Sequence, residues 1–261
     1  MTIRICVAGA TGWVGEALCP AIKAASDLKL VGAVARKSAG RPVPSVPEVT
    51  LSASLAEALK VPADVLIDYT HPGAVKSHVL TAVEAGIGAV IGTSGLSAAD
   101  YAEIDRAARK RSVGVIAAGN FSLTAALMLR FATMAAEHVP QWEVLDFASF
   151  TKPDAPSGTA RELAERLGEV RKPRLGVAIE AMHGPKETRG ADIAGTRVHS
   201  LRLPGFVIAC EAVFGAESER LSIRHEAGMS PAPYVAGTLL AARKVGQVTG
   251  LIRGLDRLLF D

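Results

Sequence analysis

One lysine lies directly before a proline-containing turn that leads into a helix, in the run from Thr151 to Ala160 (TKPDAPSGTA). Pro153 and Pro156 disfavour helix just before them, and Ser157 or Thr159 can cap the helix that follows. Its apolar residues recur at helical spacing, at positions Ala160, Leu163, Ala164 and Leu167. The spacing predicts a helix that begins near Gly158.

The start of this helix is suited to binding an anion. Its first turn carries unpaired backbone N–H groups and the positive end of the helix dipole, and glycine lets a ligand come close. Lys152 adds a full positive charge. The pattern therefore predicts a carboxylate site that depends on Lys152. A capped surface helix beside a solvated lysine is the alternative interpretation.

A glycine-rich turn follows the first apolar run, Ile3 to Ala8, and predicts a nucleotide-binding loop. Gly9 allows a tight turn, Gly12 lets backbone amides approach a pyrophosphate, and Gly15 lets the next helix pack on the sheet. The spacing is G-x-x-G-x-x-G rather than the commoner G-x-G-x-x-G. The candidate cofactor-binding residues in this loop are Gly9, Ala10, Thr11, Gly12, Trp13, Val14 and Gly15.

The second strand, Leu28 to Ala35, ends in Arg36 and Lys37, where an enzyme that uses NAD usually has an acid for the ribose hydroxyls. Basic side chains at this position suit a 2′-phosphate. NADPH is therefore the expected cofactor, with NADH possible. A glycine turn that binds no nucleotide is the alternative.

The first half of the chain alternates apolar strands with helices, which predicts a doubly wound parallel sheet of the Rossmann type. Further strands are expected at Asp64–Tyr69, Ala89–Thr93 and Val113–Ala118, and helices at Gly73–Ala85, Ala98–Arg111 and Leu123–Glu137. Ligands of such sheets bind outside the carboxyl ends of the strands. The candidate cofactor-binding residues there are Thr70, Gly92, Thr93, Ser94, Gly119, Asn120 and Phe121.

From Gln141 the pattern changes to strands with one clear helix, which predicts a second, α+β domain with a mixed sheet. The strands are expected at Trp142–Phe150, Leu175–Ala181, Val198–Leu203, Phe206–Phe214 and Arg220–Glu226. Arg41–Val49 and Gly184–Gly195 are expected to be loops, the second of them mobile. Residues 233–245 are expected to be helical, and residues 251–260 to return to the first domain. The predicted domains are residues 1–120 with 231–261, and residues 121–230.

The composition is typical of a soluble enzyme, with 49% hydrophobic and 21% charged residues among 261. A net charge of +3 gives no reason to expect nucleic acid or a membrane as a partner. The three cysteines lack metal-type spacing and lie in apolar segments, so we expect no metal site and a reducing, cytoplasmic environment. No signal segment opens the chain, and Arg130 interrupts its longest apolar helix.

The chain resembles the dihydrodipicolinate reductase family of bacterial lysine biosynthesis over nearly its whole length. The matching segments are the loop of Gly9, Gly12 and Gly15, IDYTHP (67–72), VIGTSG (90–95), GNFS (119–122), Lys152 with DAPSGTA (154–160), and HSLR (199–202). The resemblance implies NAD(P)H-dependent reduction of a cyclic imine dicarboxylate by a homotetramer. It further implies that Ser157, Gly158 and Thr159 hold a substrate carboxylate, and that hinges lie near Asn120 and Ser230.

One departure from the family concerns the proton that accompanies hydride transfer. The family has a pair of histidines shortly before the lysine, one of which is taken to donate that proton, whereas this chain has Ala148 and Ser149. Either Lys152 or a histidine such as His183 replaces the donor, or the substrate is another imine or enamine that is protonated from solvent. A nucleotide-binding protein without catalysis and an amino-acid dehydrogenase that runs in the oxidative direction remain alternatives.

Overall fold

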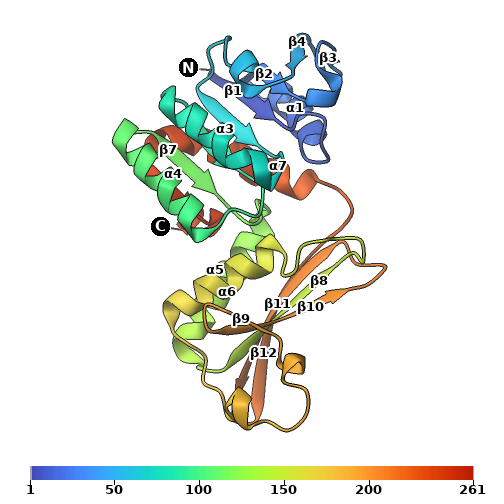
Figure 1. Cartoon of the computed structure of the whole chain (residues 1–261), viewed down its shortest axis with the longest axis vertical. Helices are drawn as coiled ribbons and strands as arrows, with labels where there is room; N and C mark the ends of the chain where they lie inside the picture. Colours follow the sequence, from blue (N-terminus) through green and yellow to red (C-terminus); the bar gives the residue numbers. More distant parts are fainter. Residues whose placement is uncertain (1, 261) are drawn as a thin grey trace. The chain divides into compact units, whose positions relative to one another are not determined.

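The computed structural model describes residues 2–260, which form two compact units (Figure 1). The first unit contains the chain up to Leu123 and from Pro231 onward, and the second contains Thr124–Ser230. Whether they act as separate domains with hinges stays a prediction. Each unit is described by itself.

The first unit is built on an eight-stranded sheet in the order β13-β7-β6-β5-β1-β2-β4-β3. The strands are β1 (Ile3–Ala8), β2 (Leu28–Val34), β3 (Pro42–Val43), β4 (Val46–Ser52), β5 (Val65–Asp68), β6 (Gly88–Ile91), β7 (Gly114–Ala117) and β13 (Gly250–Arg253). All neighbours pair in parallel except β3 and β4. Because β1 lies between β2 and β5, the chain changes direction across the sheet at β1. The predicted doubly wound sheet is confirmed.

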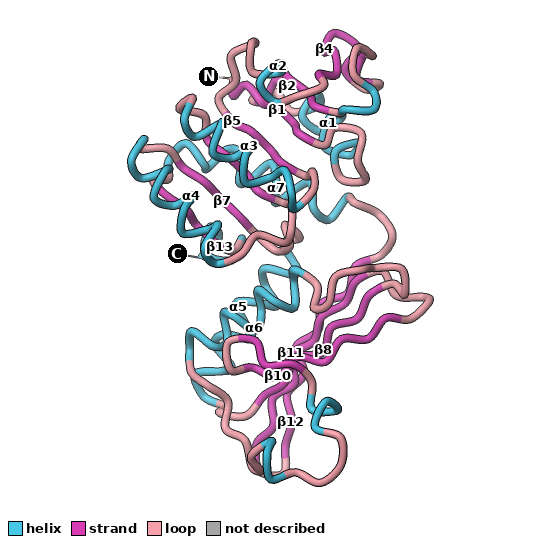
Figure 2. The backbone as a smooth tube through the Cα atoms, viewed as in Figure 1, coloured by secondary structure: helices cyan, strands magenta, loops and turns pink. Residues whose placement is uncertain are grey.

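Helices cover both faces of this sheet, as buried parallel strands require. They are α1 (Gly15–Ala24), α2 (Leu55–Ala58), α3 (Pro72–Glu84), α4 (Ala98–Arg111), α7 (Ala232–Lys244) and α8 (Leu255–Phe260), with short 3-10 turns η1 (Arg36–Ser38) and η4 (Val245–Gln247). In Figures 1 and 2, α3 and α4 lie in front of the sheet and α7 lies behind it. Strands β5, β6 and β7 are buried along their whole length.

The predicted surface loop at Arg41–Val49 is wrong, because this segment forms β3 and most of β4. Val46, Val49 and Leu51 are buried, so the apolar side chains of a proline-rich segment still find the core. Prolines are compatible with a short edge hairpin, where not every backbone N–H has a partner strand. Composition alone therefore misled the prediction.

The second unit is an α+β unit with a five-stranded mixed sheet in the order β12-β11-β8-β10-β9. Its elements are α5 (Leu123–His138), β8 (Trp142–Ala148), α6 (Gly158–Val170), η2 (Ile179–Ala181), η3 (Lys186–Arg189), β9 (Ala191–Ile193), β10 (Thr196–Arg202), β11 (Ile208–Ala216) and β12 (Glu219–Ala227). Only the pair β8–β10 is parallel. The predicted mixed sheet is confirmed.

Helices α5 and α6 pack on one face of the mixed sheet. Alternate residues of β8 face them, so Trp142 and Val144 join Leu163 and Leu167 of α6 and Phe214 of β11 in one core. The intervening residues of β8 face the other side and are half-buried. The alternation of buried and half-buried residues along β8 thus shows which side of the strand faces the core.

Two predictions in this unit fail between α6 and β10. The strand expected at Leu175–Ala181 is wrong, since only Ile179–Ala181 is regular and it forms a 3-10 turn. Leu175 and Val177 are exposed, and a strand needs a neighbour to pair with. Conversely, the loop expected at Gly184–Gly195 contains η3 and β9, which pairs with β10.

Candidate functional site

The glycine loop between β1 and α1 has the close contacts expected of a nucleotide-binding turn. Gly9 has φ of +85°, and a Cβ there would lie 2.1 Å from the carbonyl oxygen of Tyr69. A Cβ on Gly15 would lie 2.1 Å from the carbonyl oxygen of Gly9. Only glycine therefore fits at either position. The N-cap residue of α1, Val14, provides no side-chain cap. The backbone N–H groups of Glu16 and Ala17 bond to the carbonyl oxygens of Gly12 and Val14, so a phosphate would bind to loop amides that precede Glu16.

The other predicted cofactor residues lie at the same, carboxyl edge of the sheet, because each follows a parallel strand. Arg36 and Lys37 form η1 after β2 and are exposed. Thr70 follows β5, and Gly92, Thr93 and Ser94 follow β6. The strand order changes direction at β1, which lies between β5 and β2. The carboxyl edge at these strands is therefore the switch point of the sheet, where a dinucleotide usually binds. The loop geometry and the cradle at Gly9 and Gly15 fit an NAD(P) cofactor.

Two predicted cofactor residues have side chains that serve the fold. Phe121 is 1% exposed and its ring contacts the ring of Tyr69, with a centroid distance of 6.3 Å. Asn120 is 6% exposed, and its Oδ1 accepts a hydrogen bond from the backbone N–H of Ser122 at 2.8 Å. In this structure their side chains are therefore internal, and a ligand at this turn would meet mainly backbone.

Trp13 is the aromatic residue of the glycine loop, and it is 51% exposed. Its ring packs edge-on against Tyr234 at the start of α7, with ring centroids 5.6 Å apart. The C-terminal segment thus contributes a side chain beside the predicted nucleotide loop. Sequence reasoning did not find Tyr234, because 221 positions of chain separate it from Trp13 and no motif marks it.

In the second unit, α6 begins at Gly158 as predicted, with Ser157 as its N-cap. The Ser157 hydroxyl accepts from the backbone N–H of Ala160 at 3.3 Å. Lys152 lies in the loop before this turn, and its Nζ is 2.7 Å from Oδ1 of Asp154. Thr159 is buried and Gly158 is half-buried. The structure thus places the predicted substrate residues in one loop and the first helical turn after it.

A buried carboxylate that the sequence analysis did not single out organises this turn. Asp146 of β8 is 0% exposed, and its Oδ2 accepts hydrogen bonds from the backbone N–H of Ser157 at 3.0 Å, Ser200 Oγ at 2.9 Å and Arg202 Nη2 at 2.8 Å. Arg202 Nη2 also donates to the carbonyl oxygen of Asp154 at 2.6 Å. Asp146 therefore ties β8, β10 and the substrate turn together.

The hydrogen bonds also set the charge state of Asp146. Burial by itself would raise the pKa of this carboxyl, but the hydrogen bonds from Ser157, Arg202 and Ser200 outweigh that effect and hold the pKa below its usual value. Asp146 is thus ionised at neutral pH and is balanced by Arg202. The sequence did contain a signal for this residue. Asp146 is an acidic residue at an inward-facing position of an alternating strand, and a buried charge needs a partner.

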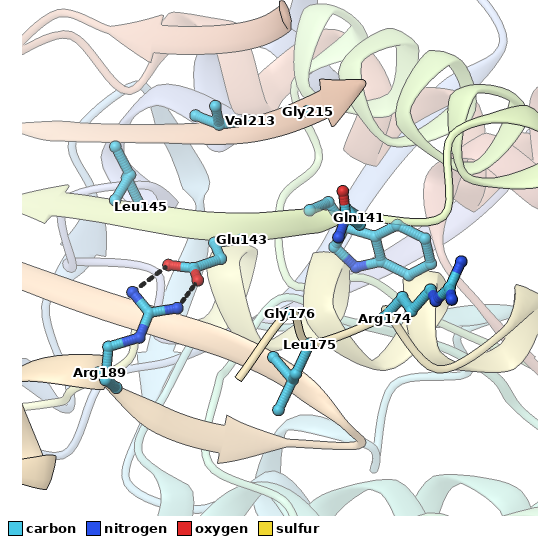
Figure 3. Close-up of a pocket in the computed structure, with 10 residues that line it drawn as sticks. Gln141, Glu143, Leu145, Arg174, Leu175, Gly176, Arg189, Val213 and Gly215 are labelled. Carbon is cyan, nitrogen blue, oxygen red and sulfur yellow. Dashed lines mark hydrogen bonds and ion pairs between the residues drawn. The ribbon is translucent and has the colours of Figure 1, made fainter. Parts of the chain in front are cut away.

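A pocket of about 390 Å³ lies elsewhere on this unit, on the side of β8 that faces away from the helices (Figure 3). Glu143 points there and pairs with Arg189, and its Oε2 is also 2.7 Å from Nε2 of His199. The pocket contains none of the predicted site residues. His183, a candidate proton donor, is exposed in the segment between η2 and η3.

Some general properties accompany these sites. All three cysteines are buried free thiols, and burial raises the pKa of Cys19 to about 11, so none is poised as a nucleophile. Within residues 2–260, no cluster of three or more His, Cys, Asp or Glu side chains could hold a metal ion. No helix in that range is long and apolar enough to cross a bilayer.

A Rossmann-like sheet with a nucleotide cradle, followed by a mixed-sheet unit with a charged helix start, defines an NAD(P)-binding oxidoreductase. The chain belongs to the dihydrodipicolinate reductase family. The family's N-terminal sequence profile matches residues 3–121 and its C-terminal profile matches residues 124–259.

Similar proteins agree with this placement. The 4-hydroxy-tetrahydrodipicolinate reductases of Desulfitobacterium hafniense and Nocardia farcinica are 37% and 39% identical, over 98% of this chain and 98% of theirs. A solved dihydrodipicolinate reductase from Paenisporosarcina sp. TG-14, with dipicolinate bound, is 28% identical. It superposes with a TM-score of 0.78 over 99% of this chain and 100% of that one.

Proposed function

We propose that this protein reduces a cyclic imine dicarboxylate with NADPH, as a 4-hydroxy-tetrahydrodipicolinate reductase of the lysine and diaminopimelate pathway. The observation that carries the proposal is that Lys152 lies in the loop that leads directly into the N-terminus of α6, which Ser157 caps. The full-length similarity to enzymes of that name supports it. The solved relative that carries dipicolinate, a planar dicarboxylate, supports the substrate class.

The substrate carboxylate is held by Lys152 and by the first turn of α6, at Ser157, Gly158 and Thr159. In the free protein the Lys152 ammonium pairs with Asp154. Both side chains are about one-third exposed, so an incoming carboxylate can replace Asp154 at little cost. The neighbouring Asp146 is already neutralised by Arg202 and does not repel the substrate. Lys152 then stabilises the negative carboxylate next to the carbon that is reduced.

The nucleotide binds at the carboxyl edge of the parallel sheet and, when bound, supplies the hydride. The loop from Gly9 to Gly15 holds the pyrophosphate at the start of α1. Arg36 and Lys37 bind the 2′-phosphate of NADPH, and their exposure leaves both guanidinium and ammonium groups accessible. NADH, which lacks that phosphate, binds more weakly in this proposal.

In this proposal solvent protonation, considered above for another imine, applies to the lysine-pathway substrate as well, and the proton is in place before the hydride is transferred. By the resemblance, Ala148 and Ser149 correspond to the family's histidine pair. Ala148 is 0% exposed, and Ser149 Oγ is 3.0 Å from Thr151 Oγ1. Neither side chain can act as a general acid near neutral pH. An imine nitrogen protonated in water needs only hydride, so Lys152 is free to remain a carboxylate ligand. Donation by Lys152 itself, or by His183, is the competing proposal.

Ala148 and Ser149 also favour a second candidate function, a divergent imine reductase or amino-acid dehydrogenase that acts on another carboxylated substrate. A protein that binds NADPH without catalysis is the third candidate. NADPH consumption should be compared for hydroxy-tetrahydrodipicolinate, piperideine carboxylate and pyrroline carboxylate. Fastest turnover of the first supports the lysine-pathway assignment, and fastest turnover of another supports the divergent reductase. Tight NADPH binding with no turnover of any would sink the enzymatic proposal.

The role of Lys152 can be tested directly. We expect Lys152→Ala to lower kcat/KM by about two orders of magnitude or more, since charge-assisted contacts to a carboxylate are among the stronger polar interactions. Lys172→Ala, at an exposed lysine of the same unit, should have no such effect. NADPH affinity should be unchanged in both variants, and an equal loss of NADPH affinity in Lys152→Ala would show that the site is misassigned.

We also propose a homotetramer that works in the reducing cytoplasm. The half-buried side of the mixed sheet carries Leu145, Phe147 and Val213, with Leu201 36% exposed beside them. Apolar side chains that stay partly exposed on this sheet face suit contact with another copy. Sedimentation equilibrium should show four chains in the wild type and a smaller particle for Phe147→Glu.

A further inference from the structure

Asp68, the last residue of β5, is a buried carboxylate at the carboxyl edge of the parallel sheet. It is 0% exposed, and in the sheet register it lies opposite Ala8, which precedes the glycine loop, and Ile91, which ends β6. Its backbone carbonyl accepts from the N–H of Gly92 at 2.9 Å. Asp68 thus lies between three loops that the function assigns to the nucleotide.

The side chain of Asp68 links two of these loops. Oδ1 accepts from the backbone N–H of Thr70 at 3.0 Å, from Thr70 Oγ1 at 2.6 Å and from Thr93 Oγ1 at 2.9 Å. The N–H of Thr70 also lies 2.8 Å from Thr93 Oγ1, which closes the network. One carboxylate oxygen therefore fixes the position of the loop after β5 relative to the loop after β6.

The second oxygen of Asp68 is held by α3. Oδ2 lies 2.8 Å from Nδ1 of His78, whose side chain is 21% exposed. A carboxylate only accepts hydrogen bonds, so Nδ1 carries the hydrogen and donates it. Because both oxygens are occupied, the Asp68 side chain cannot rotate without breaking bonds on both sides. His78 therefore orients the carboxylate that orients the two loops.

The sheet order indicates which half of the nucleotide these loops meet. The pyrophosphate lies at the β1–α1 loop, and β2, which carries Arg36 at its end, lies on one side of β1. Strands β5 and β6 lie on the other side. A dinucleotide that spans the switch point with its adenosine end at Arg36 has its nicotinamide half over Thr70 and Thr93.

We propose that Asp68 and His78 are positioning residues for the nicotinamide half of the cofactor. Neither side chain needs to touch the cofactor: Asp68 holds the loops at Thr70 and Thr93, and His78 holds Asp68. The proposal rests on the NADPH-binding function above and adds residues to it. Its consequence is selective, because the adenosine half binds on the other side of β1 and does not depend on this network.

The test compares two ligands by isothermal titration calorimetry of the full chain. NADPH reports both halves of the site, and adenosine 2′,5′-bisphosphate reports only the adenosine half. The variant Asp68→Asn should weaken NADPH binding about tenfold or more, because an amide replaces the carboxyl group that joins Thr70, Thr93 and His78. Adenosine 2′,5′-bisphosphate should bind within about twofold of wild type, since none of its expected contacts involve the network.

Two matched variants at His78, one without a hydrogen-bond donor and one that keeps it, still test the inference if Asp68→Asn does not fold. His78→Leu removes the donor, and should weaken NADPH about three- to tenfold, the effect of one hydrogen bond to a charged group. His78→Asn places an N–H donor at the same number of bonds from Cα as Nδ1, so it should restore NADPH affinity to within about twofold.

Three outcomes would overturn the inference. In the first, His78→Leu binds NADPH like the wild type. In the second, His78→Asn is as weak as His78→Leu. In the third, both ligands weaken equally, which indicates general loosening of the fold. Failure of the NADPH-binding function on which the inference rests looks different, because the wild type itself would then not bind NADPH. Loss of turnover alone, with NADPH still bound, would refute the catalytic proposal and leave this inference standing.

Discussion

The buried pair of Asp146 and Arg202 allows a quantitative prediction. Asp146 is 0% exposed and the Arg202 side chain is 17% exposed, with Nη2 2.8 Å from Oδ2. The substitution Arg202→Met keeps much of the volume and removes the guanidinium. It leaves a carboxylate in the interior without its cation, a change that typically costs about 3–5 kcal/mol. Because Asp146 keeps its bonds from Ser157 and Ser200, we expect a loss near the lower end, about 3 kcal/mol.

Urea unfolding followed by tryptophan fluorescence can measure this loss in the second unit alone. The chain has two tryptophans, of which Trp142 is buried against Phe214 in the second unit and Trp13 is exposed in the first. In a Trp13→Phe background, the signal therefore reports the second unit. With a slope of about 1–3 kcal/mol per M urea, a loss of about 3 kcal/mol lowers the midpoint by at least about 1 M.

Controls separate this pair from arginine pairs in general. Arg224→Met removes an arginine that is 38% exposed, pairs with Glu226 and Glu211 and lies over the Phe147 ring. Solvent screens both ion pairs and methionine can keep an apolar contact with the ring, so we expect a loss of less than about 1 kcal/mol. Combining Arg202→Met with Asp146→Asn should recover part of the loss, because the unpaired charge is gone. If Arg202→Met were no more destabilising than Arg224→Met, the reasoning about Asp146 would be wrong.

Three further predictions concern cofactor choice, the glycine loop and pH. Arg36→Asp should shift the ratio of kcat/KM values toward NADH by about tenfold or more, since it replaces attraction for a 2′-phosphate by repulsion; an unchanged ratio removes Arg36 from the site. Gly15→Ala should weaken NADPH binding by about tenfold or more, because a Cβ 2.1 Å from the Gly9 carbonyl oxygen forces the loop to move. Gly176→Ala, where no atom lies within 4 Å of a new Cβ, should bind normally. For pH, the folded pKa of Asp146 lies below its unfolded value of 3.8, so its contribution to stability is present above that pH and is lost as pH falls through the folded pKa. Titration of unfolding below pH 4 should thus be shallower in Asp146→Asn, and an identical slope would contradict the assignment.

Periodicity and local turn chemistry predicted most of the fold. The runs at Ile3–Ala8 and Ala98–Arg111 were placed to the residue, and the start of α6 at Gly158 was predicted from the proline–serine–glycine turn. These features depend on backbone constraints and on apolar spacing, both of which lie within a few residues of chain. The same reasoning failed at Leu175–Ala181, because a strand exists only where a partner strand is present.

The candidate site divides along the same line. Its local parts are the glycine loop and the lysine turn, and each is a run of contiguous residues. Glycines let a ligand come close to the backbone, and Lys152 provides the positive charge, so both parts could be predicted from the sequence. The two carboxylates that hold these parts in place, Asp68 and Asp146, were missed, since their partners are up to 56 positions away. A buried charge is stable only where folding brings several donors to it. The sequence by itself therefore determined which turns are present to bind ligands, and the tertiary structure decided how those turns are held relative to the strands beneath them.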